Sequence, residues 1–335
     1  MFTRCLLVTE TSQIATARRG AAAAAQAAAF DAVDIGRVAL AATELATNVL
    51  RHGSGGMLLV RTVEAASGDA GIELLALDKG PGMRNVQECL RDGFSTAGTP
   101  GSGLGAVRRQ ADVFDVYSVP GTGTAVLALL WPRRAAPSAD QAVQIGSVAV
   151  AKPGEEICGD GWSVRLQGHR LVAMVADGLG HGLFAAQAAG EAVRLFNRQQ
   201  RGSARDAVEA IHAGLRATRG AAVAVADVDM VEHRLLFSGI GNIAGTLVTN
   251  GQTRRLVSLN GIAGHAAPRI QAFSYPYSGH AFLLIMHSDG LAMSWALDRY
   301  PGLAARHPGI IAGVLFRDFS RTRDDATVLV VRSTR

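Results

Sequence analysis

The chain has 335 residues and is 48% hydrophobic, which is enough for two domains that each bury a core. Its 33 basic and 28 acidic residues are interspersed, with no basic stripe among aromatic residues, which argues against nucleic acid as a partner. No apolar run approaches the ~20 residues of a membrane helix, and the three cysteines form no Cys-x-x-Cys motif, so we expect a cytoplasmic protein with free thiols and no membrane partner.

The first expected elements are a short strand over residues 4–9 and an Ala-rich helix over about 15–30. A second helix is expected over about 34–52. It carries Glu44 and Asn48, which are four residues apart and therefore share a face. A carboxylate and an amide on one face suit a hydroxyl held by the acid and a cation held by the amide oxygen. An isolated pair of this kind also fits a solvated polar stripe.

Three glycine-rich turns then alternate with strands. The expected strands cover about 57–64, 71–77, 114–119 and 124–131. The turn Asp78-Lys79-Gly80-Pro81-Gly82 places an acid at a strand end beside two glycines. Gly101-Ser102-Gly103-Leu104-Gly105 precedes an expected helix that runs to about residue 112, so its N–H groups and the helix dipole could bind a phosphate. Gly121-Thr122-Gly123-Thr124 is expected to form the tight turn between the last two strands.

In this order and at these spacings, the motifs resemble the GHKL ATP-binding fold, and specifically the serine kinases of bacterial partner switching, the RsbT and RsbW type. The resemblance covers about residues 5–131 and implies an α/β sandwich of the Bergerat type that binds ATP with Mg²⁺. It implies that Glu44 is the catalytic base, that Asn48 is the Mg²⁺ ligand and that Asp78 hydrogen-bonds the adenine amino group. It also implies a lid at 83–103. The other nucleotide-binding positions that it implies are Gly80, Gly82, Gly101, Gly103, Gly105 and Thr124.

A linker is expected after this first domain, which we place at residues 1–131. The segment 132–138 is bracketed by prolines and poor in large apolar residues, so we place the linker at 132–141 and a second domain at 142–335. The elements expected in the second domain are strands near 143–151 and 162–175, helices near 183–199 and 204–217, several strands to about 288, a helix near 302–316 and a last strand near 325–332.

Four acidic turns lie beside apolar runs in this second domain. They are Gly159-Asp160, Asp177-Gly178-Leu179-Gly180-His181-Gly182, Ser288-Asp289-Gly290 and Asp324-Asp325-Ala326-Thr327. Carboxylates at strand ends, with few cysteines or histidines beside them, suit hard cations such as Mg²⁺ or Mn²⁺ rather than zinc. The second half of the chain therefore predicts a metal site.

On the same four turns, the second half resembles the SpoIIE/RsbX-type members of the PPM metal-dependent phosphatases. The resemblance implies an α-β-β-α sandwich in which a metal pair activates a water for attack on a phosphoserine phosphorus. It implies that Asp177 bridges the metals, assisted by the Gly178 carbonyl. The acids that complete the predicted metal site are Asp160, Asp289 and Asp324.

Three assignments in this site stay open. Asp325 is an alternative to Asp324 as the last ligand. The larger eukaryotic-type enzymes hold phosphate with an arginine near the first acid, and here Lys152 or Arg165 is the candidate replacement. His181 is either a proton donor or a loop residue with no special role.

Together the two resemblances predict a bifunctional regulator, an ATP-dependent protein serine/threonine kinase joined to a protein serine/threonine phosphatase. The expected phospho-substrate is a STAS-domain antagonist, with a sigma factor or downstream regulator as a further partner. Two alternatives remain. In one, the first domain is a binding module that uses ATP only as a conformational ligand. In the other, it is a nucleotide sensor that regulates the phosphatase.

Overall fold

The computed structural model of the chain describes residues 3–65, 68–90, 103–133, 142–199, 201–267 and 269–333. The chain forms two compact units, Met1–Asp140 with Leu297–Arg317 and Gln141–Ala296 with Asp318–Arg335. The change of unit after Asp140 falls within the expected linker. The segment Leu297–Arg317 differs from the sequence-based division, because it groups with the first unit although it lies far along the second half of the chain.

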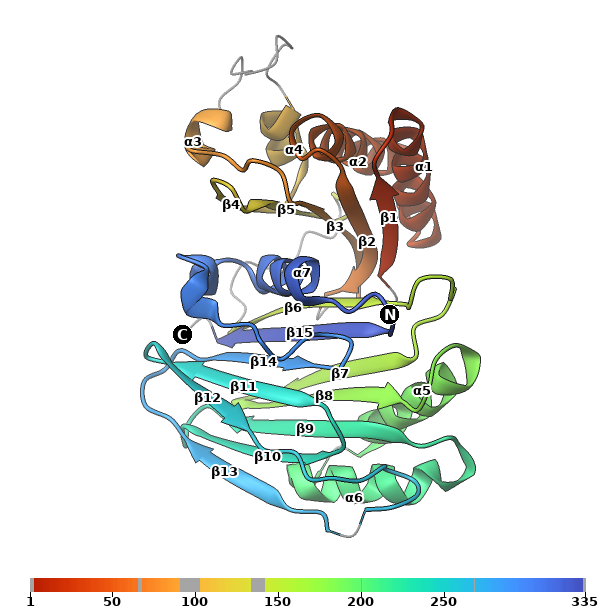
Figure 1. Cartoon of the computed structure of the whole chain (residues 1–335), viewed down its shortest axis with the longest axis vertical. Helices are drawn as coiled ribbons and strands as arrows, with labels where there is room; N and C mark the ends of the chain where they lie inside the picture. The colour runs from red at the N-terminus through yellow and green to blue at the C-terminus, as the bar shows by residue number, and fades with distance from the viewer. Residues whose placement is uncertain are drawn as a thin grey trace. The chain divides into compact units, whose positions relative to one another are not determined.

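The first unit is built on a five-stranded antiparallel sheet with the strand order β1-β2-β3-β5-β4 (Figure 1). The strands are β1 (Arg4–Val8), β2 (Gly56–Glu64), β3 (Ala70–Asp78), β4 (Val113–Val119) and β5 (Gly123–Leu130). The helices are α1 (Thr11–Ala27), α2 (Ala32–His52), α3 (Val86–Cys89) and α4 (Gly103–Gln110). Every element expected in this half of the chain is present, with bounds that differ by a few residues.

Helices α1 and α2 cover one face of this sheet because each carries an apolar stripe. Helix α1 buries small residues, and a Cβ on Gly20 would lie 3.0 Å from Leu6 Cδ1, so glycine lets this helix lie close to β1. Helix α2 begins at its N-cap Asp31 and buries Leu45 and Val49 among other apolar residues. A stripe with this spacing places the polar residues beside it at the rim of the core, where Glu44 is half-buried.

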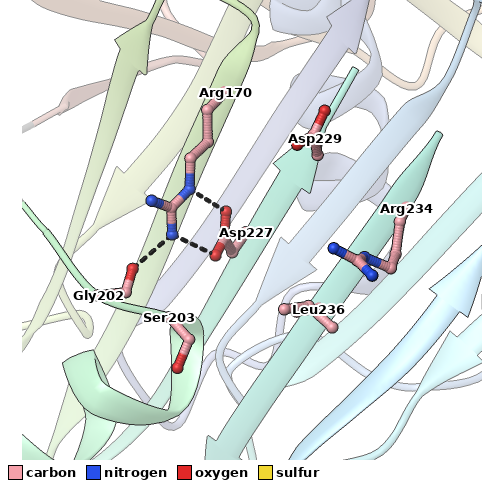
Figure 2. Close-up of a pocket in the computed structure, with 7 residues that line it drawn as sticks. All are labelled: Arg170, Gly202, Ser203, Asp227, Asp229, Arg234 and Leu236. Atoms are coloured by element: carbon pink, nitrogen blue, oxygen red, sulfur yellow. Dashed lines mark hydrogen bonds and ion pairs between the residues drawn. The ribbon is translucent and has the colours of Figure 1, made fainter. Parts of the chain in front are cut away.

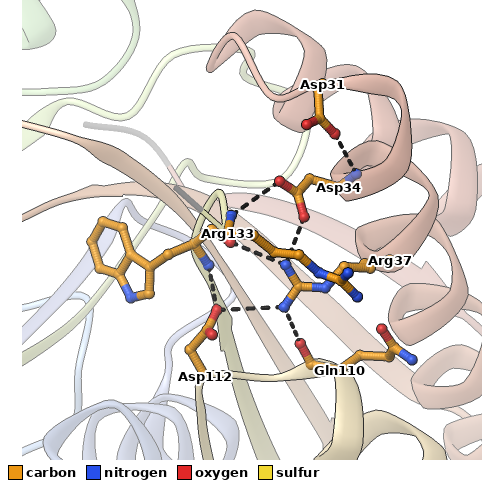
Figure 3. A network of polar contacts seen from close by, with 7 residues as sticks. Asp31, Asp34, Arg37, Gln110, Asp112 and Arg133 are labelled. Atoms are coloured by element: carbon orange, nitrogen blue, oxygen red, sulfur yellow. Dashed lines mark hydrogen bonds and ion pairs between the residues drawn. The ribbon is translucent and has the colours of Figure 1, made fainter. Parts of the chain in front are cut away.

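A buried polar network fixes the start of α2 against the ends of α4 and β5 (Figure 3). The Arg37 guanidinium donates to Asp34 at 2.7 Å, to the carbonyl of Gln110 at 2.6 Å and to the carbonyl of Trp131 at 3.2 Å. Burial raises the pKa of Asp34, but the hydrogen bonds from Arg37 and from the Arg133 N–H outweigh burial, so the pKa is lowered overall. The network therefore sets the position of α4 relative to α2.

The opposite face of the sheet carries helix α7 (Pro308–Phe319), which lies mostly in the segment that groups with the first unit. A Cβ on Gly313 would lie 2.6 Å from Leu75 Cδ2, and one on Gly309 would lie 3.2 Å from Leu127 Cδ1. Arg317 Nη1 donates to the Asp78 carbonyl at 2.9 Å. A helix expected within the second domain thus packs on the sheet of the first unit.

The second unit contains two five-stranded antiparallel sheets, with strand orders β13-β10-β9-β8-β7 and β12-β11-β14-β15-β6. The strands are β6 (Val143–Val150), β7 (Asp160–Gln167), β8 (Arg170–Gly178), β9 (Ala221–Asp229), β10 (Arg234–Ile240), β11 (Ala244–Thr249), β12 (Gln252–Leu256), β13 (Ala272–Pro276), β14 (Leu283–His287) and β15 (Ala326–Ser333). The single strand expected near 162–175 is instead the β7–β8 hairpin, because the chain turns at Gly168, where φ is +59°.

Apolar side chains fill the space between the two sheets of the second unit, where Phe237, Leu284 and Leu329 belong to one buried cluster. Helices α5 (Leu183–Arg198) and α6 (Ala204–Gly214) cover the other face of the β7–β10 sheet through a second cluster, which contains Phe196. The cysteines are free, as predicted, and Cys158 is buried. In the ranges that the structure describes, no helix is both long enough and apolar enough to cross a membrane.

Candidate functional site

Helix α2 and the first turn of α4 bring three predicted nucleotide-site residues together. A Cβ on Gly103 would lie 3.1 Å from Glu44 Oε2 and 3.4 Å from Asn48 Oδ1, so both side chains lie close to the start of α4. The Asn48 Nδ2 atom is buried and has no hydrogen-bond partner in the described part of the chain. Because buried polar groups are usually paired, this orphaned amide fits a site that a ligand completes.

Asp78 lies at the end of β3, where its carboxyl group is held in place by backbone N–H groups. Asp78 Oδ1 accepts from the N–H of Gly80 at 2.9 Å and from the N–H of Thr124 at 3.1 Å. Burial raises the pKa of Asp78, although these hydrogen bonds and the charges of Arg317 and His52 oppose the rise. With Oδ1 fixed in this way, Oδ2 is left to accept a hydrogen bond from a ligand.

The two glycine-rich turns beside Asp78 depend on close backbone approach. Gly82 has φ +69°, and a Cβ there would lie 2.2 Å from the Val119 carbonyl oxygen. Gly123 has φ +94°, and a Cβ there would lie 2.1 Å from the Asp78 carbonyl oxygen. Of the other predicted nucleotide-site glycines, Gly105 is buried in α4. Gly101 and residues 91–102 of the predicted lid lie outside the described residues.

In the second unit, strand pairing brings the first two acids together. Asp160 at the start of β7 is the register partner of Asp177 near the end of β8. Asp160 Oδ2 accepts from Ser288 Oγ at 2.6 Å, and Ser288 Oγ accepts from the Thr327 N–H at 2.9 Å. Ser288 therefore joins the first acidic turn to the third and the fourth. The Ser-Asp-Gly motif contained this residue, but the sequence indicated a role only for its aspartate.

The carboxylates of the four turns interact strongly with one another. Burial, together with the charges of Asp160, Asp289 and the two acids of the last turn, raises the pKa of Asp177 to about 9. Burial also raises the pKa of Asp160 to about 7, against the hydrogen bond that its carboxylate accepts from Ser288. The cluster thus concentrates negative charge that its hydrogen bonds do not offset.

The donor set fits a divalent cation with a preference for oxygen ligands. Asp160 Oδ1 and Asp325 Oδ2 are buried and have no hydrogen-bond partner in the described part of the chain. Carboxylate oxygens without donors, beside acids with raised pKa values, suit Mg²⁺ or Mn²⁺. Within the described ranges, no group of three or more His, Cys, Asp or Glu side chains is already arranged to hold a metal ion. The exact ligand set therefore stays a prediction.

The two candidate acids of the last turn have different surroundings. Asp325 is buried, and its Oδ1 accepts from the Lys152 N–H at 2.8 Å. The charge of Asp325 raises the pKa of Asp160. Asp324 is half-buried, and its charge raises the pKa of Asp289. The charge of Asp324 thus affects the pKa of Asp289, and the charge of Asp325 affects the pKa of Asp160.

The structure corrects one predicted phosphate contact. Arg165 stacks over Phe196 at 4.2 Å and donates to the Gln199 carbonyl. It lies five residues along β7 from Asp160, which is about 16 Å of extended strand. Arg165 is therefore not beside the acids. Lys152 contributes its backbone N–H to the cluster.

Two further side chains border the acid cluster. Asn242 Nδ2 donates to Asp289 Oδ2 at 2.6 Å, and no motif in the sequence indicated this residue. His181 Nδ1 lies 2.6 Å from Glu155 Oε1, so the loop after Asp177 is tied to the loop that follows β6. The hydrogen bond with Glu155 thus uses one of the two ring nitrogens of His181.

A pocket of about 360 Å³ lies at the other end of β8, where this strand begins (Figure 2). Arg170 donates to both carboxylate oxygens of Asp227, at 2.7 and 2.6 Å. The N-terminus of α6 beside the pocket is already capped by Ser203 with Asp206. We assign no function to this pocket, because Arg170 is paired with Asp227 and the helix terminus is satisfied.

Comparison with known proteins gives a family for each half of the chain. Residues 7–129 match the histidine kinase-like ATPase domain family. Residues 167–334 match the stage II sporulation protein E (SpoIIE) family. The chain is 35% identical over 129 residues to the serine/threonine-protein kinase RsbT of Bacillus subtilis, covering 38% of this chain and 96% of RsbT. It is 23% identical over 142 residues to the phosphoserine phosphatase RsbX of Bacillus subtilis, covering 42% of this chain and 70% of RsbX.

A crystal structure of RsbX in complex with magnesium superposes on the chain with a TM-score of 0.52 and 19% identity, covering 59% of this chain and 98% of RsbX. At this identity the likeness concerns the fold. With the family matches it confirms the predicted fold class, two α+β domains of the GHKL and PP2C types. The chain belongs to both families, as an RsbT-like kinase domain of the histidine kinase-like ATPase family fused to a SpoIIE/RsbX-like phosphatase domain.

Proposed function

We propose that this protein both adds phosphate to a serine or threonine of a small partner protein and removes it. The observation that carries the proposal is that each half of the chain brings its own predicted site residues together. Glu44 and Asn48 meet over Gly103 in one half, and Asp160 faces Asp177 in the other. The relatives named as a serine/threonine kinase and a phosphoserine phosphatase match these same two halves.

In the proposed kinase site, the residues position groups and neutralise charge. Asp78 Oδ2 accepts a hydrogen bond from the adenine amino group, because its other oxygen is already fixed by two backbone N–H groups. The Asn48 side chain holds Mg²⁺ through its amide oxygen. Glu44 lies across Gly103 from Asn48 and accepts the proton of the partner's hydroxyl group. The N–H groups at the start of α4 face the phosphates.

In the proposed phosphatase site, Asp177 is the central carboxylate, with Asp160, Asp289 and Asp324 around it. A bound Mg²⁺ or Mn²⁺ pair supplies a Lewis acid and lowers the pKa of a water. Ser288 orients Asp160, and Asn242 orients Asp289. The Gly178 carbonyl and Asp325 are the remaining oxygen donors of the proposed set.

The proposed partner is a STAS-domain antagonist, with a sigma factor or a downstream regulator as a further partner, and the proposed location is the cytoplasm. The test incubates an authentic partner and ATP with wild-type protein, with Glu44→Ala or with Asp177→Asn, and measures the phosphorylated fraction on phosphate-affinity gels. We expect no phosphate with Glu44→Ala and more than the wild-type level with Asp177→Asn. A phosphorylated fraction at or below the wild-type level with Asp177→Asn contradicts opposed activities.

One observation favours the alternative in which ATP regulates the phosphatase. The segment Leu297–Arg317 lies inside the SpoIIE family match but groups with the first unit. It contacts the ATP-binding half through Arg317 and the Asp78 carbonyl. In this alternative, ATP changes the phosphatase rate of Glu44→Ala. In the kinase proposal, ATP leaves that rate unchanged.

A further inference from the structure

The loop that follows Asp177 exposes large apolar side chains beside the acid cluster. Leu179 is 49% exposed, and Leu183 and Phe184 are each 56% exposed. We call these three residues the apolar lip. Single exposed leucines are common on protein surfaces, but three large apolar residues within six positions of the chain indicate a surface that binds something.

Arg219 lies in a neighbouring turn, and its side chain packs against the same loop. Its guanidinium carbon lies 4.8 Å from the centre of the Phe184 ring, in a cation–π contact. Its Nη1 atom lies 3.3 Å from the position that a Cβ on Gly180 would occupy. The Leu179 N–H donates to the Gly220 carbonyl at 3.0 Å, which fixes this turn against the loop.

Arg219 carries a positive charge that the described structure does not neutralise. Its side chain is exposed, and it makes no ion pair with any carboxylate in the described ranges. A phosphorylated ligand carries negative charge, so an unpaired cation at the border of the cluster favours its binding. Stacking on Phe184 keeps this guanidinium beside the loop and leaves its donors available.

We infer that the apolar lip and Arg219 form the substrate-docking surface of the phosphatase site, an inference that rests on the proposed function. The occupant is a phosphoserine segment of the partner with an apolar side chain next to the phosphoserine. The apolar neighbour packs on Leu183 and Phe184, while Arg219 contacts the phosphorylated residue. This occupant matches both properties of the surface, because a free phosphate has no apolar part and an unphosphorylated apolar segment leaves Arg219 without a counter-charge.

The test uses the full chain with Mg²⁺ or Mn²⁺ and two phosphoserine peptides that differ only in the residues flanking the phosphoserine, Leu in one and Ser in the other. We expect kcat/KM of the wild-type protein to be about tenfold higher for the Leu peptide. In Phe184→Ser this preference should fall below about twofold. The control Leu166→Ser makes a similar change at a 47% exposed residue of β7 and should keep the preference.

A second pair of variants tests the arginine. Arg219→Gln should raise KM for both peptides about tenfold, and Arg219→Lys should recover part of the loss because it restores the charge. A loss of folding in Arg219→Gln would affect kcat as well, and the lysine variant separates the two causes.

Several outcomes would overturn the docking surface and leave the phosphatase function intact. These are equal hydrolysis of the two peptides by wild-type protein, an unchanged preference in Phe184→Ser and an equal loss in Leu166→Ser. A wild-type dimer that Phe184→Ser converts to monomers, as measured by sedimentation, would assign the lip to a second copy of the chain. Absence of hydrolysis of both peptides by wild-type protein would refute the proposed phosphatase function itself.

Discussion

The acid cluster should lower the stability of the metal-free protein, and Asp177→Asn should therefore stabilise it. The folded protein raises the pKa of Asp177 from its ordinary value of 3.8 to about 9, with burial as the main cause. Between these two pH values the folded state keeps a proton that the unfolded state releases. Stability from this group is therefore highest below pH 3.8 and falls as the pH rises toward 9.

The expected effect follows from the interval between the ordinary pKa and the working pH. Each pH unit above the ordinary pKa of 3.8 costs about 1.4 kcal/mol, so the cost is about 4 kcal/mol at pH 7 and about 2 kcal/mol at pH 5. Asparagine does not ionise and removes this cost. In a unit of this size, 1 kcal/mol shifts Tm by roughly 2–4 °C, so Asp177→Asn should melt about 8–16 °C above wild type at pH 7 in EDTA.

Thermal unfolding in EDTA at pH 5, 6 and 7 measures this difference. The control is Asp229→Asn, because Asp229 lies on the same sheet and its pKa is lowered by a hydrogen bond from the Glu232 N–H, so its amide should give no stabilisation. Mg²⁺ should then stabilise wild type more than Asp177→Asn, because the cation compensates the carboxylates. The reasoning fails if Asp177→Asn is the less stable protein at pH 7, or if the difference does not grow between pH 5 and pH 7.

Three further predictions concern nucleotide, packing and metal. Asp78→Asn should weaken ATP binding at least tenfold in calorimetry, because an amide can present a donor to the adenine amino group. Asn48→Ala should remove mainly the part of ATP binding that depends on Mg²⁺, and equal affinities in the two variants would contradict these roles. Arg37→Met should lower the free energy of unfolding of the first unit by about 3 kcal/mol in urea, because it removes the ion-pair partner of the buried Asp34. EDTA should abolish hydrolysis of a phosphoserine peptide, Mg²⁺ or Mn²⁺ should restore it, and a strict zinc requirement would count against the carboxylate site.

The sequence predicted the elements of the first unit well because their patterns are local. Glycine is required at Gly82 and Gly123 because a Cβ at either position would lie about 2 Å from a backbone carbonyl oxygen, so the residue type itself reports the geometry. The β7–β8 hairpin was harder to predict, since Gly168 is a single glycine within a run that otherwise reads as one strand. An isolated glycine in a strand pattern fits a bulge as well as a turn.

The partners of the site residues could not be predicted in the same way. Ser288 contacts Asp160, and Asn242 contacts Asp289, and in both pairs the two residues are far apart in sequence. These contacts depend on strand register. Arg165 shows the same limit. It is only five residues from Asp160, but the extended strand carries it along the sheet, where it packs on Phe196 instead. Distance along the chain was a poor guide to distance from the site.

Helix α7 shows what periodicity alone cannot assign. An amphipathic helix buries one face, whereas residues 308–317 of α7 are all buried. A helix that is apolar on every side gives no signal for the sheet on which it packs, so its place in the chain suggested the second unit. Gly309 and Gly313 are four residues apart and lie on one face, where they approach Leu127 and Leu75 of the first unit. Small residues at this spacing let a helix lie close to a sheet, so these two glycines are the feature from which the contact could have been predicted.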